Sequence, residues 1–304
     1  MSTEYSELLD RVPGWKGRAH VVRALDGGIT NRNLLIAVGD EQFVLRLAGK
    51  DTELLEIRRS AEREAATRAA SLGLAPHVVE FLEPEGYLVT RFVSGSPISP
   101  SELASARLST VAGMVRHFHS SGPLPHDFDA FRVPMLHRDA AEARGVAIPA
   151  AFETAAAIAV RIGAAFATSP EPRVPCHNDM LNANFLADEE RVWLIDWEYA
   201  GNNDRYFDLG NLSVNNDFDS DAREALLGHY FGSATLRRSA RLELMMIMSD
   251  FREAMWGVVQ QGISTLDFDY VEYADQHFDR LRSAASSRHF DDLLDHAAGG
   301  RPDA

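Results

Sequence analysis

One short run of polar side chains has the residue types and spacing for chemistry. Residues 177–184 read His-Asn-Asp-Met-Leu-Asn-Ala-Asn, and the apolar run 192–195 ends in Asp196. The carboxylate of Asp179 can orient an attacking hydroxyl and accept its proton, while Asn184 and Asp196 offer oxygen ligands for Mg²⁺. Because phosphoryl transfer depends on positioning and charge neutralisation, this spacing predicts transfer of a phosphoryl group to an alcohol.

The same residue types also have ordinary structural uses, which is the competing interpretation. Asp and Asn side chains often cap helices and turns, and Asn178 and Asn182 fit that role. We expect His177 to support the loop structurally and not to act as an acid or base. A carboxylate five residues before Asn184, followed by a strand that ends in another carboxylate, is more specific than isolated polar residues. We therefore interpret these two carboxylates and Asn184 as functional.

The elements expected around these residues divide the chain into two parts. Residues 34–38 and 42–47 form a predicted hairpin around Gly39 and Asp40. The other elements expected before the Gly-, Pro- and Ser-rich linker at 94–100 are a helix at 53–71 and strands at 78–82 and 87–92. Beyond the linker we expect one strand and mainly helices: 101–121, 150–168, 192–195 (the strand), 221–231, 238–262 and 270–286. This pattern predicts an α+β fold with a small antiparallel-sheet N-lobe, residues 1–93, and a larger, mainly helical C-lobe, residues 94–304.

Composition narrows the classes of function. The chain has 304 residues and a net charge of -15, which argues against nucleic-acid binding because phosphate contacts need clustered Lys and Arg. Cys176 is the single cysteine, so a reducing, cytoplasmic location is expected. The first ten residues are acidic and lack the pattern of a secretory signal. The apolar segment 150–167 contains Glu153 and Arg161, so it is interpreted as a buried helix and not as a membrane span.

These motifs together resemble the choline/ethanolamine kinase family, within the aminoglycoside-phosphotransferase-like kinases. Residues 177–184 resemble the catalytic loop of the family and residues 195–199 its metal-binding segment. Residues 203–211 are similar to the continuation of that segment. The similarity to the choline branch lies in segments 249–251, 256–260 and 268–274. The resemblance implies a bilobal protein-kinase-like fold that uses ATP and Mg²⁺, with Asp179 as the base and metal ligands Asn184 and Asp196.

The resemblance also implies a nucleotide site in the N-lobe. The turn at 27–33 would cover the phosphates through Gly28, Thr30 and Asn31. Arg46 would contact a phosphate and pair with Glu62, or with Glu64 instead, because a lone buried guanidinium is costly. The backbone at the hinge, residues 90–93, would pair with the adenine edge through Arg91 and Phe92.

The acceptor implied by the resemblance is a small cationic alcohol. Choline carries a quaternary ammonium, which needs aromatic faces and carboxylates because it cannot donate a hydrogen bond. In choline kinases the helix that corresponds to residues 238–262 typically presents two tryptophans in a W-x-x-W arrangement. Here Trp256 keeps the second position and Glu253 takes the first. Either Glu253 faces the pocket and favours a primary or secondary amine, or it is solvated and pairs with a neighbour such as Arg252. The remaining candidates for the cation site are Trp197, Glu198, Tyr199, Tyr206 and Asp208.

Three alternatives stay open at this point. The acceptor is choline or ethanolamine, or else an aminoglycoside, thiamine or another amine-bearing alcohol. A catalytically inactive kinase fold used for binding is disfavoured, because such proteins usually lose the base or a metal ligand and this chain retains Asp179, Asn184 and Asp196. No nucleic-acid partner or membrane span is expected, and the pattern leaves the oligomeric state open.

Overall fold

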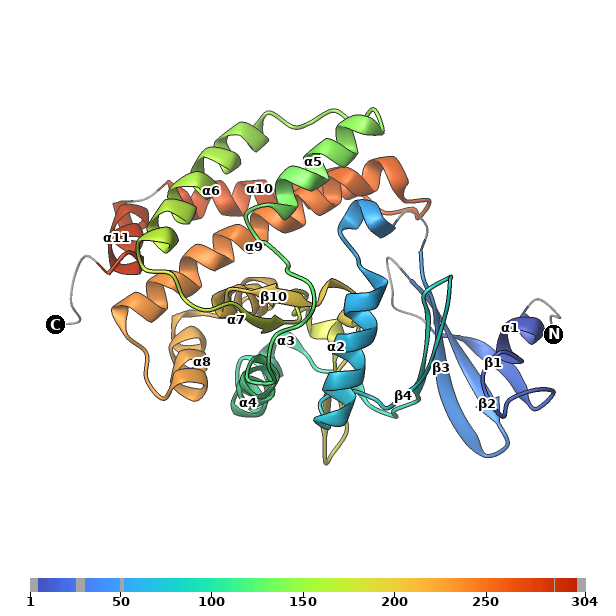
Figure 1. Ribbon diagram of the computed structural model, residues 1–304. Helices are drawn as coiled ribbons and strands as arrows, with labels where there is room; N and C mark the ends of the chain where they lie inside the picture. The colour runs from blue at the N-terminus through green and yellow to red at the C-terminus, as the bar shows by residue number, and fades with distance from the viewer. Residues whose placement is uncertain (1–4, 26–30, 50–51, 287, 300–304) are drawn as a thin grey trace.

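The computed structural model describes residues 5–25, 31–49, 52–286 and 288–299 (Figure 1). A small antiparallel sheet lies at the N-terminal end and a larger, mostly helical part makes up the rest, as Figure 1 shows. This arrangement confirms the α+β fold class predicted from the sequence.

The N-terminal sheet has five strands in the order β1-β2-β3-β5-β4, and each neighbouring pair is antiparallel. The strands are β1 (Ala19–Leu25), β2 (Arg32–Val38), β3 (Glu41–Leu47), β4 (Val78–Leu82) and β5 (Tyr87–Arg91). A short helix, α1 (Ser6–Leu9), precedes the sheet. The predicted hairpin is confirmed, with Phe43 opposite Ile36 and Leu45 opposite Leu34. Phe43 and Leu45 pack into a small apolar core, so the alternation of a strand directs Arg46 to the opposite face.

The helix expected at 53–71 is interrupted. A 3-10 helix, η2 (Thr52–Leu55), comes first, and α2 (Arg59–Ser71) begins only after Glu56, whose φ of 61° is left-handed. A non-glycine residue in that conformation cannot continue an α-helix. The alanines of α2 at 61, 65, 66 and 69 are buried. Small side chains on this face let α2 approach η4 (Trp197–Tyr199), so the helix lies directly against the catalytic region.

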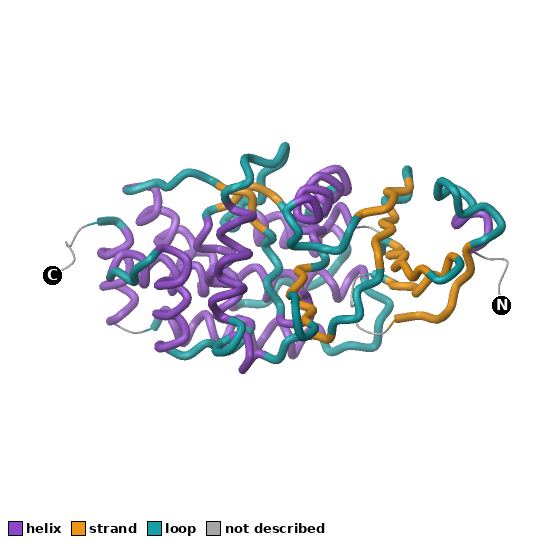
Figure 2. Tube along the Cα trace, turned by 90° about the horizontal axis from the view of Figure 1, so that it is seen from below, coloured by secondary structure: helices purple, strands orange, loops and turns teal. Residues whose placement is uncertain are grey.

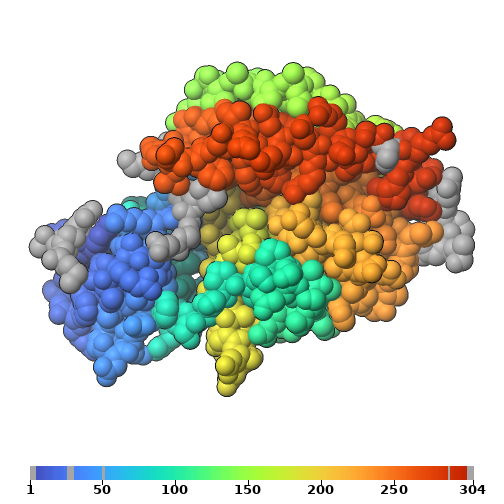
Figure 3. Space-filling view, turned by 180° about the vertical axis from the view of Figure 1, so that it is seen from behind, coloured from blue at the N-terminus to red at the C-terminus, as the bar shows by residue number. Residues whose placement is uncertain are grey.

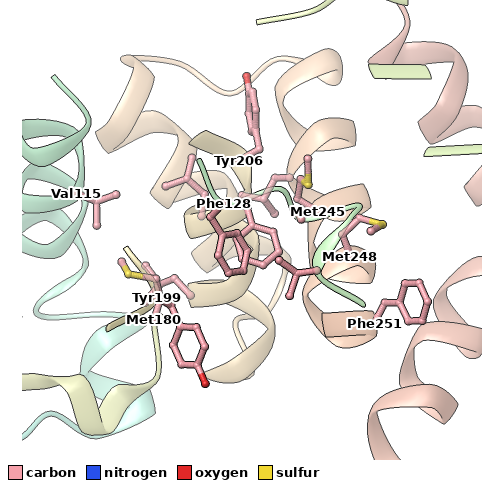
Figure 4. Packing of buried hydrophobic residues seen from close by; sticks show 14 of the residues in the cluster. Val115, Phe128, Met180, Tyr199, Tyr206, Met245, Met248 and Phe251 are labelled. Carbon is pink, nitrogen blue, oxygen red and sulfur yellow. The ribbon is translucent and has the colours of Figure 1, made fainter. Parts of the chain in front are cut away.

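The helical part is organised around one long helix, α9 (Leu236–Ile263), which contacts α5, α7, α10 and α11. Figure 4 shows its buried side chains, including Met245, Met248 and Phe251. The helices around it are α3 (Pro100–Leu103), α4 (Leu108–His119), α5 (Val133–Ala143), α6 (Ala151–Thr168), α7 (Arg205–Asn215), α8 (Ser220–Phe231), α10 (Tyr270–Ala285) and α11 (Arg288–Ala297). The helix expected at 101–121 is in fact two, and α5, α7 and α11 were not predicted.

Short strands hold the catalytic region. β7 (Val174–Cys176) pairs with β10 (Gly201–Asn203), and β8 (Phe185–Ala187) pairs with β9 (Val192–Leu194) and β6 (Ser96–Pro97). Figure 2 shows these strands between the helices, apart from the N-terminal sheet. The hairpin of β8 and β9 projects at the lower edge of Figure 3. β7 and β9 belong to different sheets, and hydrogen bonds of Ile195 with Asn184 and His177 join the loop after β7 to the segment after β9.

Helix α6 is long and apolar enough to cross a membrane by length and composition alone. In the structure it contacts α9, α10 and α11 through one face, which buries Phe152, Ala155, Ile162 and Phe166. The opposite face is open, and Val160 is 72% exposed. The expectation of a buried helix therefore holds for one face only, as in a helix that covers a core.

Candidate active site

The loop after β7 is held in place by one buried carboxylate. Asp208 of α7 is 1% exposed and accepts the backbone N–H groups of His177 at 2.8 Å and Asn178 at 2.7 Å. Its Oδ2 also lies 3.0 Å from His119 Nε2. Burial alone would raise the pKa of Asp208, but the hydrogen bond from His119 and the amide of His177 lower it below the usual value. Asp208 thus shapes the loop, and its assignment to a cation site is wrong.

His177 and Trp197 are structural. His177 Nδ1 accepts the N–H of Asp179 at 3.2 Å, and its Nε2 lies 2.9 Å from the carbonyl of Ile195, to which it donates. Burial lowers the pKa of His177, so the ring is neutral. Trp197 packs against this ring and donates its Nε1–H to Leu194. His177 therefore supports the loop as predicted, and Trp197 is excluded from the acceptor site.

The base candidate and the two metal-ligand candidates come together. Asn184 Nδ2 donates to the carboxylate of Asp179 at 3.0 Å and to its carbonyl at 2.9 Å. The carbonyl of Asn184 accepts the N–H of Ile195 at 2.9 Å, which ties the loop to the segment after β9. Asp196 follows in a left-handed conformation, φ 63°, and its side chain is 30% exposed. This arrangement leaves the amide oxygen of Asn184 and the carboxylate of Asp196 as oxygen donors of the kind that Mg²⁺ prefers.

Arg46 connects the sheet to these residues. It forms an ion pair with Glu62, which is fully buried, and lies 2.9 Å from Asp196 and 3.5 Å from Glu198. The predicted pairing of Arg46 with Glu62 is thereby confirmed. The alternative partner, Glu64, instead pairs with a neighbour on its own helix at 2.8 Å.

Arg59 is a second cation that sequence reasoning missed. It lies 2.7 Å from Glu62 and 3.3 Å from Glu198, and it donates to Thr52 at 3.1 Å. Burial and the nearby charge of Arg46 lower the pKa of Arg59. The sequence held one signal, because Arg59 precedes Glu62 by three residues and shares its helix face. Two guanidinium groups thus face a group of carboxylates at the base of the sheet.

Glu198 belongs to this group and not to the acceptor end. It is 3% exposed and accepts from Asn31 Nδ2 at 2.9 Å. Burial, with the charge of Asp196, raises the pKa of Glu198. The structure therefore places Glu198 and Asn31 beside Arg46, whereas the sequence-based assignment put Glu198 with the acceptor. Gly28 and Thr30, assigned to the same phosphate turn, lie outside the described residues.

The hinge differs from the expectation. The N–H of Arg91 donates to the carbonyl of His77 at 2.9 Å, and the N–H of Phe92 donates to the carbonyl of Gln42 at 3.1 Å. The Arg91 side chain points to solvent and pairs with Glu41 at 2.5 Å. These two amides are used within the sheet, so they cannot also donate to an adenine edge. Pairing through the amides of Arg91 and Phe92 is therefore contradicted.

Glu253 fits the second predicted description in part, because it pairs with Arg252 as predicted but is not solvated. It is 2% exposed, so it is not solvated, and its Oε1 accepts from Arg252 at 2.5 Å. Its Oε2 accepts from the hydroxyl of Tyr273 at 3.0 Å. Burial alone would raise the pKa of Glu253, but the charge of Arg252 lowers it, so the carboxylate is ionised. Glu253 is therefore a buried, compensated charge.

An aromatic cluster surrounds this pair. Trp256 is 6% exposed and donates its Nε1–H to the hydroxyl of Tyr199 at 3.0 Å. It also packs edge-on against Tyr270 and Tyr273. Tyr206, by contrast, stacks on Phe231 in the core, so its assignment to a cation site is wrong.

Arg252 is the central residue that sequence reasoning did not place at the site. It is 2% exposed, and its Nη1 lies 4.0 Å from the Oδ1 of Asp179. Its guanidinium carbon lies 4.3 Å from the centre of the Tyr199 ring. The base therefore has a cation and an aromatic ring on the side that leads to α9. The sequence carried little signal for this position of Arg252, because an arginine in an apolar helix is usually interpreted as a side chain whose charged end extends to solvent.

The pH dependence of activity follows from the surroundings of Asp179. Burial raises the pKa of this carboxyl to about 7, and Glu253 and Asp196 act in the same direction. A base works only when ionised, so kcat/KM is expected to fall as the pH drops through about 7, far above the usual value of about 3.9 for Asp. Steady-state rates from about pH 5 to 9 measure this. A profile that stays flat down to about pH 5 contradicts a buried carboxylate base.

Known proteins match this arrangement. The phosphotransferase enzyme family matches residues 21–242. Ethanolamine kinase 2 of Mus musculus is 27% identical over 293 residues, covering 86% of this chain and 75% of that protein. LicA of Haemophilus influenzae is 28% identical over 217 residues, 67% of this chain and 61% of that protein.

Solved structures give the same picture. A choline/ethanolamine kinase family protein of Mesorhizobium loti superposes with a TM-score of 0.82 at 30% identity, covering 98% of this chain and 99% of that one. A thermostable mutant of an aminoglycoside phosphotransferase has a TM-score of 0.66 at 19% identity, over 93% and 100% of the two chains, which shows a shared fold. The chain therefore belongs to the choline/ethanolamine kinase family of phosphotransferase enzymes, and it is a phosphotransferase with an alcohol group as acceptor.

Proposed function

We propose that the protein transfers the γ-phosphate of ATP, with Mg²⁺, to the hydroxyl of a cationic amino alcohol of the ethanolamine or choline type. The observation that carries the proposal is the convergence of Asp179, Asn184 and Asp196 beside the buried cation Arg46. Relatives named ethanolamine kinase support the choice of acceptor. We further propose that residues 1–93 hold the nucleotide, that residues 94–304 hold metal and acceptor, and that the reaction takes place in the cytoplasm.

Asp179 would accept the proton of the attacking hydroxyl. Its carboxylate is oriented by the amide of Asn184, and its side chain keeps 12% exposure through which a hydroxyl can reach it. Asn184, with its free amide oxygen, and Asp196 would hold Mg²⁺, and Glu198 is a third oxygen donor close to Asp196. The metal, when bound, neutralises phosphate charge. Arg46 and Arg59 would contact the phosphates, since both are guanidinium groups that lie beside Glu198, one of the residues that would hold the metal.

A panel of acceptors tests the proposal. Purified protein is incubated with ATP, Mg²⁺ and one alcohol, and release of ADP is measured together with the phosphorylated product. We expect turnover with ethanolamine or choline and none with the variant Asp179→Asn. Turnover confined to an aminoglycoside or thiamine would replace the acceptor and keep the reaction. Absence of turnover with every alcohol would favour a binding protein with a kinase fold.

Removal of the metal gives a further prediction. Chelation should abolish turnover, and Asp196→Asn should raise the Mg²⁺ concentration for half-maximal activity. Supporting residues around bound metals are worth about 10–100-fold in metal affinity, and a direct carboxylate ligand is expected to matter at least as much. A Mg²⁺ titration of activity measures the change. Asp139→Asn is the matched control, because Asp139 is 59% exposed on α5. Equal Mg²⁺ dependence in Asp196→Asn and the parent protein would remove Asp196 from the metal site.

A further inference from the structure

Arg252 is a buried cation without a full set of hydrogen bonds. Its Nη1 donates to Glu253 at 2.5 Å, whereas its Nε and Nη2 are buried and have no hydrogen-bond partner within the described part of the chain. Leaving guanidinium donors buried and unpaired is costly, so a fold that only needed stability would gain by replacing them. This cost suggests a role for Arg252 other than packing.

The guanidinium occupies the aromatic surface next to the base. Its carbon lies 4.3 Å from the Tyr199 ring centre, while its Nη1 is 4.0 Å from Asp179 Oδ1. Tyr199 cannot easily turn away, because its hydroxyl accepts the Nε1–H of Trp256 at 3.0 Å. Arg252 is fixed in turn by Glu253, which Tyr273 holds from α10. A cation of the protein itself therefore lies on a ring that a cationic acceptor would use.

Few neighbouring groups compensate the positive charge of Arg252. Among the described residues, the carboxylates within 4.0 Å of it are Glu253 and Asp179. His137 on α5 is fully buried, and burial and the charge of Arg252 lower its pKa to about 3, so it is neutral. Because His137 is neutral and Arg252 is the cation that Glu253 pairs with, removing the charge of Arg252 should change the local balance directly.

An ammonium with N–H groups and one without them are expected to bind differently to a site in which Arg252 covers the Tyr199 ring. A quaternary ammonium binds through aromatic faces and through charge alone. At this site the Tyr199 face is occupied by a guanidinium, so a quaternary ammonium loses its aromatic contact, while the repulsion between like charges acts on both kinds of ammonium. A primary ammonium can instead donate a hydrogen bond to Asp179, since its carboxylate has about four acceptor positions and its side chain keeps 12% exposure.

We propose that Arg252 determines acceptor specificity: by occupying the Tyr199 face beside Asp179, it excludes quaternary ammonium alcohols and leaves the site to primary amino alcohols. The inference rests on the proposed function, because it concerns the acceptor of the same reaction. The proposal attributes to Arg252 and Glu253 together the difference in acceptor preference from a site with the W-x-x-W pair that is typical of choline kinases. Glu253 compensates Arg252 and holds its guanidinium over the Tyr199 ring.

The test compares ethanolamine with choline in the parent protein and in Arg252→Gln. Glutamine can still donate to Glu253, so the buried carboxylate keeps a partner. The parent should favour ethanolamine by about tenfold or more in kcat/KM, the size of one desolvated cation–π contact. Arg252→Gln should lower that ratio by about tenfold, mainly through a lower KM for choline. An unchanged ratio, or a parent protein that prefers choline, would overturn the inference.

A matched control separates specificity from stability. Arg241 is also a fully buried arginine on an aromatic ring, 3.9 Å from the centre of Phe166, but it pairs with Asp204 away from the base. Arg241→Gln should reduce the stability of the fold and leave the ratio of ethanolamine to choline unchanged. A shift of the ratio in Arg241→Gln equal to that in Arg252→Gln would show a general effect of lost packing and contradict the proposal.

Binding of simple cations tests the inference in the parent protein, so the test requires neither turnover nor a variant that must fold. Isothermal titration calorimetry of the parent protein with ADP and Mg²⁺ should show binding of methylammonium and none of tetramethylammonium. Tighter binding of tetramethylammonium would overturn the role of Arg252. If no alcohol is phosphorylated and yet methylammonium binds while tetramethylammonium does not, the proposed reaction fails while the preference of the site for a primary ammonium stands.

Discussion

Replacing Asp179 with asparagine is expected to lower kcat by about 10²–10⁴, the usual contribution of a positioned base. Asparagine has the same shape, so the contact with Asn184 can persist, but the amide cannot accept the proton of the acceptor hydroxyl. The loss should therefore appear in kcat more than in the KM for ATP. Steady-state kinetics with saturating ATP and Mg²⁺ measure it, with ethanolamine or the best acceptor of the panel.

Stability separates this loss from misfolding. The raised pKa of Asp179 means that the folded protein disfavours the ionised carboxyl, so this group costs stability in full above about pH 7, and the cost declines as the pH falls from about 7 to the unfolded value of about 3.9. Asp179→Asn should therefore be at least as stable as the parent at about pH 8 by thermal denaturation. Asp279→Asn, at a site 68% exposed on α10, is the control and should leave rate and stability unchanged. Full activity in Asp179→Asn would show that another group takes the proton.

Replacing Asp208 with alanine should be the most damaging change for the fold. Two backbone N–H groups of the catalytic loop and the ring of His119 lose their acceptor. Each buried donor left unpaired costs about 1–3 kcal/mol, so a loss of about 3 kcal/mol or more in the free energy of unfolding is expected. Urea denaturation measures this loss. Activity should fall as well, because the same amides set the position of Asp179.

The control for this change is Asp219→Ala. Asp219 caps α8 by accepting the N–H of Ala222 at 2.9 Å, and loss of such a cap costs about 1 kcal/mol. The pKa of Asp208 is lowered in the fold, so its contribution is present above the unfolded value of about 3.9 and is lost as the pH falls through the folded value. The stability difference between the parent and Asp208→Ala should therefore shrink at low pH. A constant difference, or one no larger than for Asp219→Ala, would contradict this role.

The local sequence pattern was enough to predict much of the fold and the contact at the centre of the candidate site. The β2–β3 hairpin follows from alternation and a turn at Gly39, and α9 follows from its helical periodicity. Asp179 and Asn184 are five residues apart in one loop, so their contact is local and depends little on the rest of the chain. That Arg46 needs an anionic partner was also predictable, because a lone buried guanidinium is costly, whereas the choice of Glu62 over Glu64 came from the family resemblance.

The boundaries of the elements and some of the helices were harder to predict from the sequence. The left-handed Glu56 interrupts the helix expected at 53–71, although its neighbours are good helix formers. Tertiary packing accompanies that conformation, since Leu55 and Ile57 on either side of Glu56 are buried in the main apolar core. Helix α7 has ordinary polar residues in its sequence and becomes nearly fully buried only between α9 and the catalytic loop.

By itself the sequence determined the candidate reacting groups, through the residue types and their spacing in one loop and at the end of one strand, because both are local properties of the chain. The tertiary structure alone decided what surrounds them. Asp208, Arg59 and Arg252 act through contacts with residues 30, 139 and 73 positions away, at Asn178, Glu198 and Asp179. Periodicity reports which face of an element is buried, and it carries no information about which distant side chain meets that face. The charge that covers Tyr199 could therefore be found only once α9 was seen beside the loop.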